Sequence, residues 1–124
     1  MSEAYTLGKD GEQFAAEYLR AHGYRIEAER WKLHHLELDL VAIDGDSGEI
    51  VFVEVKTRMT SAFGQPEQAV DYKKMMNLVR AADAYIKQFR VDRDWRFDII
   101  SIVDGGEHRP KIVHYKDAFY PPLG

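Results

Sequence analysis

The stretch Val51-Phe52-Val53-Glu54-Val55-Lys56-Thr57-Arg58 decides how the rest of the chain is arranged. Its β-branched and aromatic residues are typical of a buried strand, yet an acid and a base lie inside it. Alternation along a strand sends the three valines to one face and Glu54 and Lys56 together to the other. The sequence therefore predicts a core strand on which an acid and a base share one face, with Cα atoms about 6.6 Å apart.

A second strand is expected just upstream, over residues 36–43, where LELDLVAI alternates. The turn-forming residues 44–48 join the two strands into an antiparallel hairpin. A loop over residues 44–49 gives a register in which Asp39 lies directly opposite Glu54, whereas a slip of one residue would turn Asp39 to the other face. Two like charges facing each other are destabilising. A divalent cation such as Mg²⁺ compensates them, because it binds one or two carboxylates together with several waters.

Two helices are expected around these strands. Apolar residues recur with helical spacing over residues 3–22 and again over 71–88. Gly8 and Gly11 each cost the first helix about 1 kcal/mol relative to alanine, so either its first turns are frayed or another group approaches closely there. Glu12 shares the inward edge of this helix, and Lys74 lies near the start of the second.

Further strands are predicted over residues 24–33 and 96–103, with a short edge strand over 112–115. The order is helix, three strands, helix, and one or two strands. This order predicts an α/β protein in which a mixed sheet is flanked by helices. The length of 124 residues predicts a single domain, 1–124.

Composition excludes several classes of protein. The net charge of −4 argues against a protein that coats nucleic acid through a general positive field, but a metal-dependent nuclease stays compatible with it. The chain has no cysteine, which excludes disulfides and thiolate sites. No signal-like N-terminus and no apolar run of membrane-spanning length is present, so a cytoplasmic protein without membrane contact is expected.

Each charged residue taken alone has an ordinary explanation. Glu54 and Lys56 can form a surface ion pair, Asp39 can be a solvated acid, and Glu12 can be a helix-surface charge. Together they match an arrangement used for metal-dependent phosphodiester hydrolysis, in which a metal activates water and Lys56 orients it or holds the phosphate. The pair His34-His35 is a poor metal site, because neighbouring residues on a strand point to opposite faces.

Asp39 followed by Glu54-Val55-Lys56 resembles the signature of the PD-(D/E)XK nucleases, whose restriction-endonuclease-like three-layer core has the order αβββαβ. More narrowly, the chain resembles the YraN family of small bacterial proteins, predicted endonucleases related to archaeal Holliday-junction resolvases. The matching segments cover most of the chain: residues 8–12, 16–19, 23–24, 37–42, 51–58, 67–70 and 96–98, with Lys74, Leu78, Ala82 and Tyr85. The chain departs from the family pattern at residues 30–32 and at Leu36, where a glycine is usual.

The resemblance implies catalytic residues Glu12, Asp39, Glu54 and Lys56, with the three acids holding Mg²⁺ or Mn²⁺. It implies phosphate contacts from Lys74, and Arg58 shares the face of Lys56 and is a further candidate. The expected activity is cleavage of structured DNA, branched DNA included, by a homodimer. One alternative is a nucleic-acid-binding or assembly module with the same fold and no turnover. Another is an interaction domain, which predicts that Glu54 and Lys56 are exposed and far from Glu12.

Overall fold

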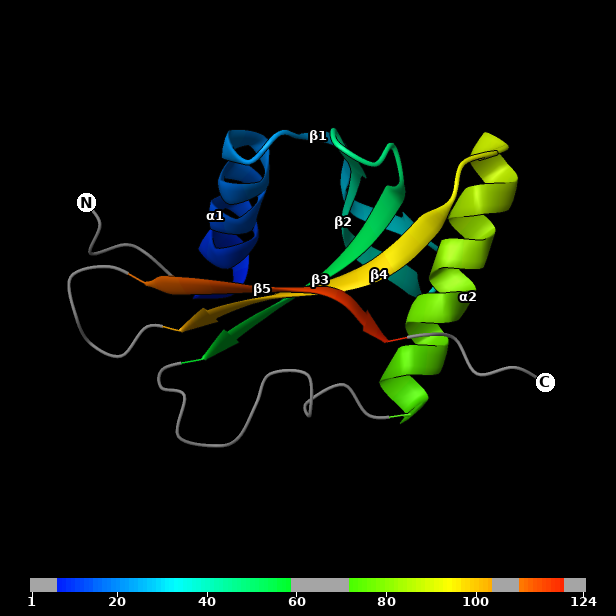
Figure 1. Ribbon diagram of the computed structural model, residues 1–124. Helices are drawn as coiled ribbons and strands as arrows, with labels where there is room; N and C mark the ends of the chain where they lie inside the picture. Colours follow the sequence, from blue (N-terminus) through cyan, green and yellow to red (C-terminus); the bar gives the residue numbers. More distant parts are fainter. Residues whose placement is uncertain (1–6, 59–71, 104–109, 120–124) are drawn as a thin grey trace.

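The protein is described by a computed structural model, which covers residues 7–58, 72–103 and 110–119 (Figure 1). Within these residues, two helices and five strands form in the order helix, three strands, helix, two strands. Their bounds are α1 Leu7–Ala21, β1 Tyr24–Leu33, β2 Leu36–Asp44, β3 Ile50–Arg58, α2 Tyr72–Phe89, β4 Trp95–Val103 and β5 Lys111–Phe119. The prediction of an α/β protein with a mixed sheet flanked by helices is confirmed.

The five strands form one sheet in the order β1-β2-β3-β4-β5. Strands β1, β2 and β3 are antiparallel neighbours, β3 and β4 are parallel, and β4 and β5 are antiparallel. The parallel pair requires a crossover connection, and α2 supplies its helix. The hairpin of β2 and β3 has the predicted register, with Leu40 paired to Val53 and Ile43 to Ile50.

The two helices cover opposite faces of the sheet (Figure 1). On one face Ala15, Ala16 and Leu19 of α1 pack against Val51 and Val53 of β3. On the other face, α2 contributes Leu78, Ala81, Ala82 and Tyr85 to a core that includes Phe52 and Val41. Burial of a side chain such as Phe52 stabilises the fold by about 1.5–3 kcal/mol. Because side chains alternate along β3, Glu54 and Lys56 share the face of Phe52, which is the face that α2 covers.

Helix α1 approaches β3 closely at Gly11. A Cβ atom at this position would lie 2.5 Å from Cγ2 of Thr57, well inside the ordinary carbon–carbon contact of about 3.5–4.0 Å. This accounts for one of the two glycines that weaken the helical pattern, because only glycine permits such an approach. The same approach holds the next residue, Glu12, near β3 and β1.

Some boundaries differ from those predicted. The last strand was predicted to be short, over residues 112–115, but β5 runs over nine residues, Lys111–Phe119. The predicted helix cap at residue 71, the turns at 66–70 and 104–106, and the start of the first helix before residue 7 lie outside the described residues. In the part of the chain that is described, neither helix has the length and apolar character that a membrane span requires.

Candidate active site

Asp39 and Glu54 lie at the end of the β2–β3 ladder. The last ladder pair is Leu40 with Val53, which is in the predicted register, and Asp39 and Glu54 follow these two residues. Instead of a further backbone pair, the amide N–H of Val55 donates a hydrogen bond to Oδ2 of Asp39, at 2.9 Å. The carboxyl of Asp39 is therefore fixed against the backbone of β3, beside Glu54.

The backbone around Asp39 is irregular. Leu38 and Val41 pack in the same core cluster although they are three residues apart, whereas regular alternation separates same-face residues by an even number. The β1–β2 register sets Asp39 opposite Arg30, whose φ of 55° lies in the left-handed region that non-glycine residues rarely adopt. Such a conformation costs of order 1–3 kcal/mol and clusters at functional sites. This kink at the site had no signal in the sequence.

The pKa of Asp39 is raised to about 7. Burial is the largest cause, and the negative charge of Glu54 is the next; the hydrogen bond from Val55 acts in the opposite direction. The charge of Glu12 and a side-chain hydrogen bond with Glu54 raise the pKa of Asp39 further. Glu54 and Glu12 therefore both act on Asp39, and burial together with these two negative charges disfavours its ionised form.

Two lysines approach Glu54. Its side chain is buried, and its Oε2 atom lies 2.9 Å from Nζ of Lys74 and 3.5 Å from Nζ of Lys56. Burial would lower the pKa of Lys74, but the hydrogen bond to Glu54 and the charges of Glu54 and Asp39 outweigh burial and raise it. A buried carboxylate with this partner avoids the high cost of an unpaired charge. Glu54 and Lys56 are thus not the exposed surface pair that an interaction domain predicts.

Glu12 lies at the edge of this group. Its Oε1 atom accepts a hydrogen bond from Nε of Arg30 at 2.8 Å, so its carboxylate binds a guanidinium and not the lysines of the site. Its effect on the pKa of Asp39 still places it within electrostatic range. In the described part of the chain, no three Asp, Glu or His side chains are arranged to hold a metal ion.

The structure also locates several other residues that the sequence analysis singled out. His34 and His35 are both exposed, in the turn between β1 and β2. The side chain of Arg58 lies outside the described part of the molecule, although its backbone ends β3. Asp98 has the structural ion-pairing role predicted for it: it is fully buried and binds Arg96 and His114.

Two contacts of the site were missed from the sequence. The pairs of Glu12 with Arg30 and of Glu54 with Lys74 each join two different elements. The only available signal was the presence of both cations in basic clusters, at 25–35 and 73–80, and basic clusters are ordinarily solvated faces.

Comparison with known proteins places the chain among bacterial relatives. The model of "Uncharacterised protein family UPF0102" matches residues 11–102. A UPF0102 protein of Bacteroides thetaiotaomicron is 50% identical over 123 residues, covering 99% of each chain. A UPF0102 protein of Porphyromonas gingivalis is 37% identical over 123 residues, covering 99% of this chain and 90% of that protein.

Proposed function

We propose that this chain, which belongs to the UPF0102 family, is a divalent-metal-dependent endonuclease that hydrolyses phosphodiester bonds in structured DNA, branched DNA included. The observation that carries the proposal is the approach of the Asp39 and Glu54 carboxyls, with Lys56 and Lys74 at Glu54. Two carboxyl groups and two lysine ammonium groups therefore lie close together. Carboxylates can bind a metal cation, and ammonium groups can bind the phosphate of the substrate.

The donor set fits Mg²⁺ or Mn²⁺. It consists of carboxylate oxygens, which both ions prefer, and a Mg²⁺ site commonly uses one or two carboxylates from the protein. Asp39 and Glu54 would hold the ion, and Glu12 would join them on leaving Arg30. When bound, such an ion provides an activated water and neutralises charge on the phosphate.

The remaining side chains have roles that follow from their charge. Lys56 is the residue that we assign to the reacting phosphate, because its long contact with Glu54 leaves its ammonium the less firmly held of the two. Lys74 compensates the charge of Glu54 in the free protein and would contact a neighbouring phosphate of the strand. Arg58 is proposed as a further phosphate contact on the same strand.

The fold supports the same proposal. A helix, three strands and a second helix leading to a parallel strand are compatible with the restriction-endonuclease-like core of PD-(D/E)XK nucleases. We include a homodimer in the proposal, since two sites related by a two-fold axis suit a symmetric four-way junction.

One alternative function has an observation in its favour. Glu12 binds Arg30 and Glu54 binds Lys74, so two of the three acids already have a cationic partner within the protein. This balance suits a module that binds nucleic acid or assembles with other proteins without turnover. In that case the basic residues matter for binding and the acids only hold them in place.

Cleavage assays separate the two functions. Labelled duplex, single-stranded, flap and four-way-junction DNA would be incubated with Mg²⁺ or Mn²⁺ and either the wild type, Lys56→Met or Glu54→Gln. We expect metal-dependent cutting by the wild type and a loss of about 10²–10³-fold in Lys56→Met, the range typical of removing one electrostatic stabiliser. Asp83→Asn is the matched control, because Asp83 is an exposed acid of α2 that pairs with Lys87.

The contrary result is equally clear. If the wild type binds these DNAs but cuts none of them, and Glu54→Gln binds as well as the wild type, the nuclease proposal fails and the binding module replaces it. Circular dichroism of each variant would establish that it is folded before either conclusion is drawn.

A further inference from the structure

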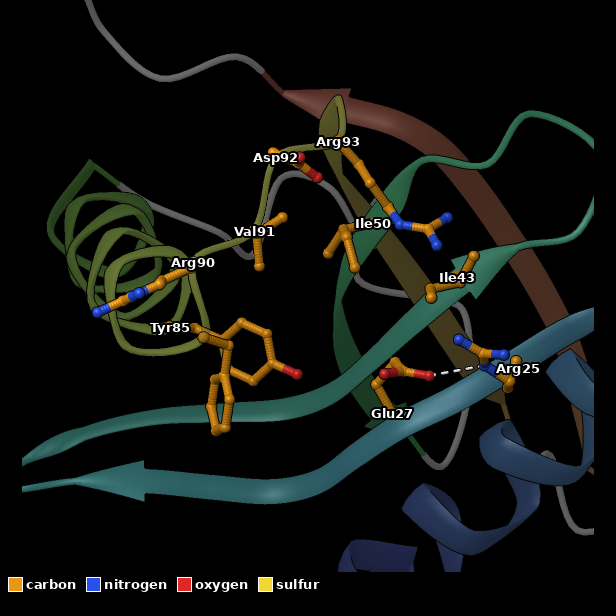
Figure 2. Close-up of a pocket in the computed structure, with 10 residues that line it drawn as sticks. Arg25, Glu27, Ile43, Ile50, Tyr85, Arg90, Val91, Asp92 and Arg93 are labelled. Carbon is orange, nitrogen blue, oxygen red and sulfur yellow. Dashed lines mark hydrogen bonds and ion pairs between the residues drawn. The ribbon is translucent and has the colours of Figure 1, made fainter.

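A cavity lies away from these acids, at the C-terminal end of α2 (Figure 2). Its volume is about 360 Å³, within the range of small-molecule sites. Lys74 and Arg90 are separated by sixteen residues, so along the helix axis the two regions are roughly 24 Å apart. The lining residues come from β1, β2, β3, the end of α2 and the segment that joins α2 to β4: Arg25, Glu27, Ile43, Ile50, Tyr85, Phe89, Arg90, Val91, Asp92 and Arg93.

The Tyr85 hydroxyl is directed into this cavity. Tyr85 is 6% exposed, and its hydroxyl points across the cavity toward Glu27 (Figure 2). Its ring packs against Trp31, Phe52 and Phe89, but its hydroxyl has no hydrogen-bond partner among the described residues. Burial and then the charge of Glu27 raise the pKa of Tyr85, so the hydroxyl stays a neutral donor. The hydroxyl therefore keeps its hydrogen-bonding capacity for a ligand that enters the cavity.

Two guanidinium groups reach the opposite side of the cavity. Nε of Arg25 donates to Glu27 at 2.8 Å, and Nη1 of Arg93 donates to the carbonyl oxygen of Gly48 at 3.0 Å. A guanidinium carries five N–H donors, so each retains donors for a ligand. The two lie on either side of Ile43 in Figure 2. Their planar, charged geometry suits a phosphate or a carboxylate.

The cavity also offers an aromatic surface. Phe89 is 51% exposed, and its ring centroid lies 4.6 Å from that of Tyr85. Ile43, Ile50 and Val91 line the same cavity. Exposed aromatic rings beside cationic groups are the usual platform for nucleobases, because every base has a face that stacks.

We propose that this cavity binds a nucleotide, with its phosphate on Arg25 and Arg93, its ring on Phe89 and its base edge between Tyr85 and Glu27. A base edge carries both donors and acceptors, which matches a hydroxyl facing a carboxylate. The nucleotide can be a free mononucleotide or one residue of a single strand. The site shares no residue with the acids around Asp39, so the inference does not depend on the proposed nuclease activity.

The first experiment measures mononucleotide binding. AMP, GMP, CMP and TMP would be titrated into ¹⁵N-labelled protein, with inorganic phosphate in parallel, and amide shifts would be followed by NMR. We expect at least one mononucleotide to shift residues around 85–93 and to bind more tightly than phosphate. Tyr85→Phe should weaken it about three- to tenfold, the loss of one hydrogen bond, with the aromatic packing intact.

Arg25→Gln and Arg20→Gln form a matched pair. Each removes an exposed arginine that pairs with one glutamate, Glu27 or Glu29, but only Arg25 lines the cavity. Weaker binding in Arg25→Gln alone supports the site. No binding by any nucleotide, equal binding in Tyr85→Phe and the wild type, or phosphate binding as tightly as the nucleotides would each overturn the proposal.

Oligonucleotides distinguish a free mononucleotide from one residue of a single strand. At about 3.4 Å per nucleotide, roughly 24 Å corresponds to about seven nucleotides. If the nucleotide belongs to a strand that also reaches Lys74, a single strand of about ten nucleotides binds more tightly than one of about four, and either Tyr85→Phe or Lys74→Gln removes that advantage. Equal binding of mononucleotide, short strand and long strand assigns the cavity to a free nucleotide.

Discussion

Replacement of Gly11 by alanine tests the contact that positions α1, and with it Glu12, on the sheet. The new Cβ atom would lie 2.5 Å from Cγ2 of Thr57, about 1 Å or more inside an ordinary contact. Overpacking of this kind costs about 1–3 kcal/mol, while alanine improves the helix by about 1 kcal/mol. The free energy of unfolding should therefore fall by about 0–2 kcal/mol in Gly11→Ala.

The sharper test is a double-mutant cycle. Thr57→Ser removes the methyl group that the alanine would meet and leaves the hydroxyl. In that background only the gain in helix propensity remains, so Gly11→Ala should stabilise the protein by about 1 kcal/mol. The difference between the two backgrounds, about 1–3 kcal/mol, is the coupling energy of the contact.

Urea denaturation followed by circular dichroism measures all four proteins of the cycle. Linear extrapolation gives the free energy of unfolding, and an unchanged slope shows that the denatured state is the same. If Gly11→Ala stabilises the protein equally in both backgrounds, the two residues are not in contact. Glu12 would then not be held near Asp39 by helix packing, and its place in the proposed site would fall.

Three further results are expected. Asp98→Asn should destabilise the protein by about 3–5 kcal/mol in urea denaturation, because it removes the buried carboxylate that both His114 and Arg96 bind, although Arg96 keeps Asp44 and Glu49. Burial would raise the pKa of Asp98, but its bonds to His114, Arg96 and the Asp117 amide outweigh burial and lower it. Stability from Asp98 is therefore present above pH about 3.9 and is lost as pH falls through the lower pKa of the folded state, and an acid titration of Asp98→Asn should lack this component. At a hundredfold excess over its Kd, Mn²⁺ should stabilise the wild type by about 2.7 kcal/mol and so raise its melting temperature, but it should not stabilise Asp39→Asn. An equal rise in both proteins would exclude Asp39 as a ligand.

The hairpin at the centre of the sheet could be predicted from the sequence because two independent signals agree there. The turn-forming residues between positions 44 and 49 fix the loop, and alternation on both sides fixes which residues face the core. The pairing of Leu40 with Val53 follows from these signals alone. The ladder from Leu40 with Val53 to Ile43 with Ile50 was therefore a consequence of local rules, whereas the position of the Asp39 carboxyl also depends on the kink, which those rules do not predict.

The last strand shows where local rules fail. Its second half includes the charged residues Lys116 and Asp117, so neither composition nor alternation predicts a strand there. In the structure Asp117 also has a φ of 54°, which is unusual for a strand residue. Charged residues on an edge strand are common, because they discourage pairing with another molecule. The strand continues because it pairs with β4, where the Asp117 amide donates to the buried carboxylate of Asp98.

The cationic partners of the site are unpredictable for a different reason. Arg30 meets Glu12, and Lys74 meets Glu54, only after each helix has packed at a particular angle against a sheet that is kinked at Asp39. No spacing in the sequence encodes those angles. The partners nevertheless explain how a core strand tolerates an acid: Glu54 is buried beside two lysines, one from its own strand and one from the facing helix. Asp39 accepts a hydrogen bond from a backbone amide, but burial and then the charge of Glu54 raise its pKa to about 7. The fold therefore pairs Glu12 with Arg30 and Glu54 with lysines, so the cation that we propose for the site would act chiefly on the charge of Asp39.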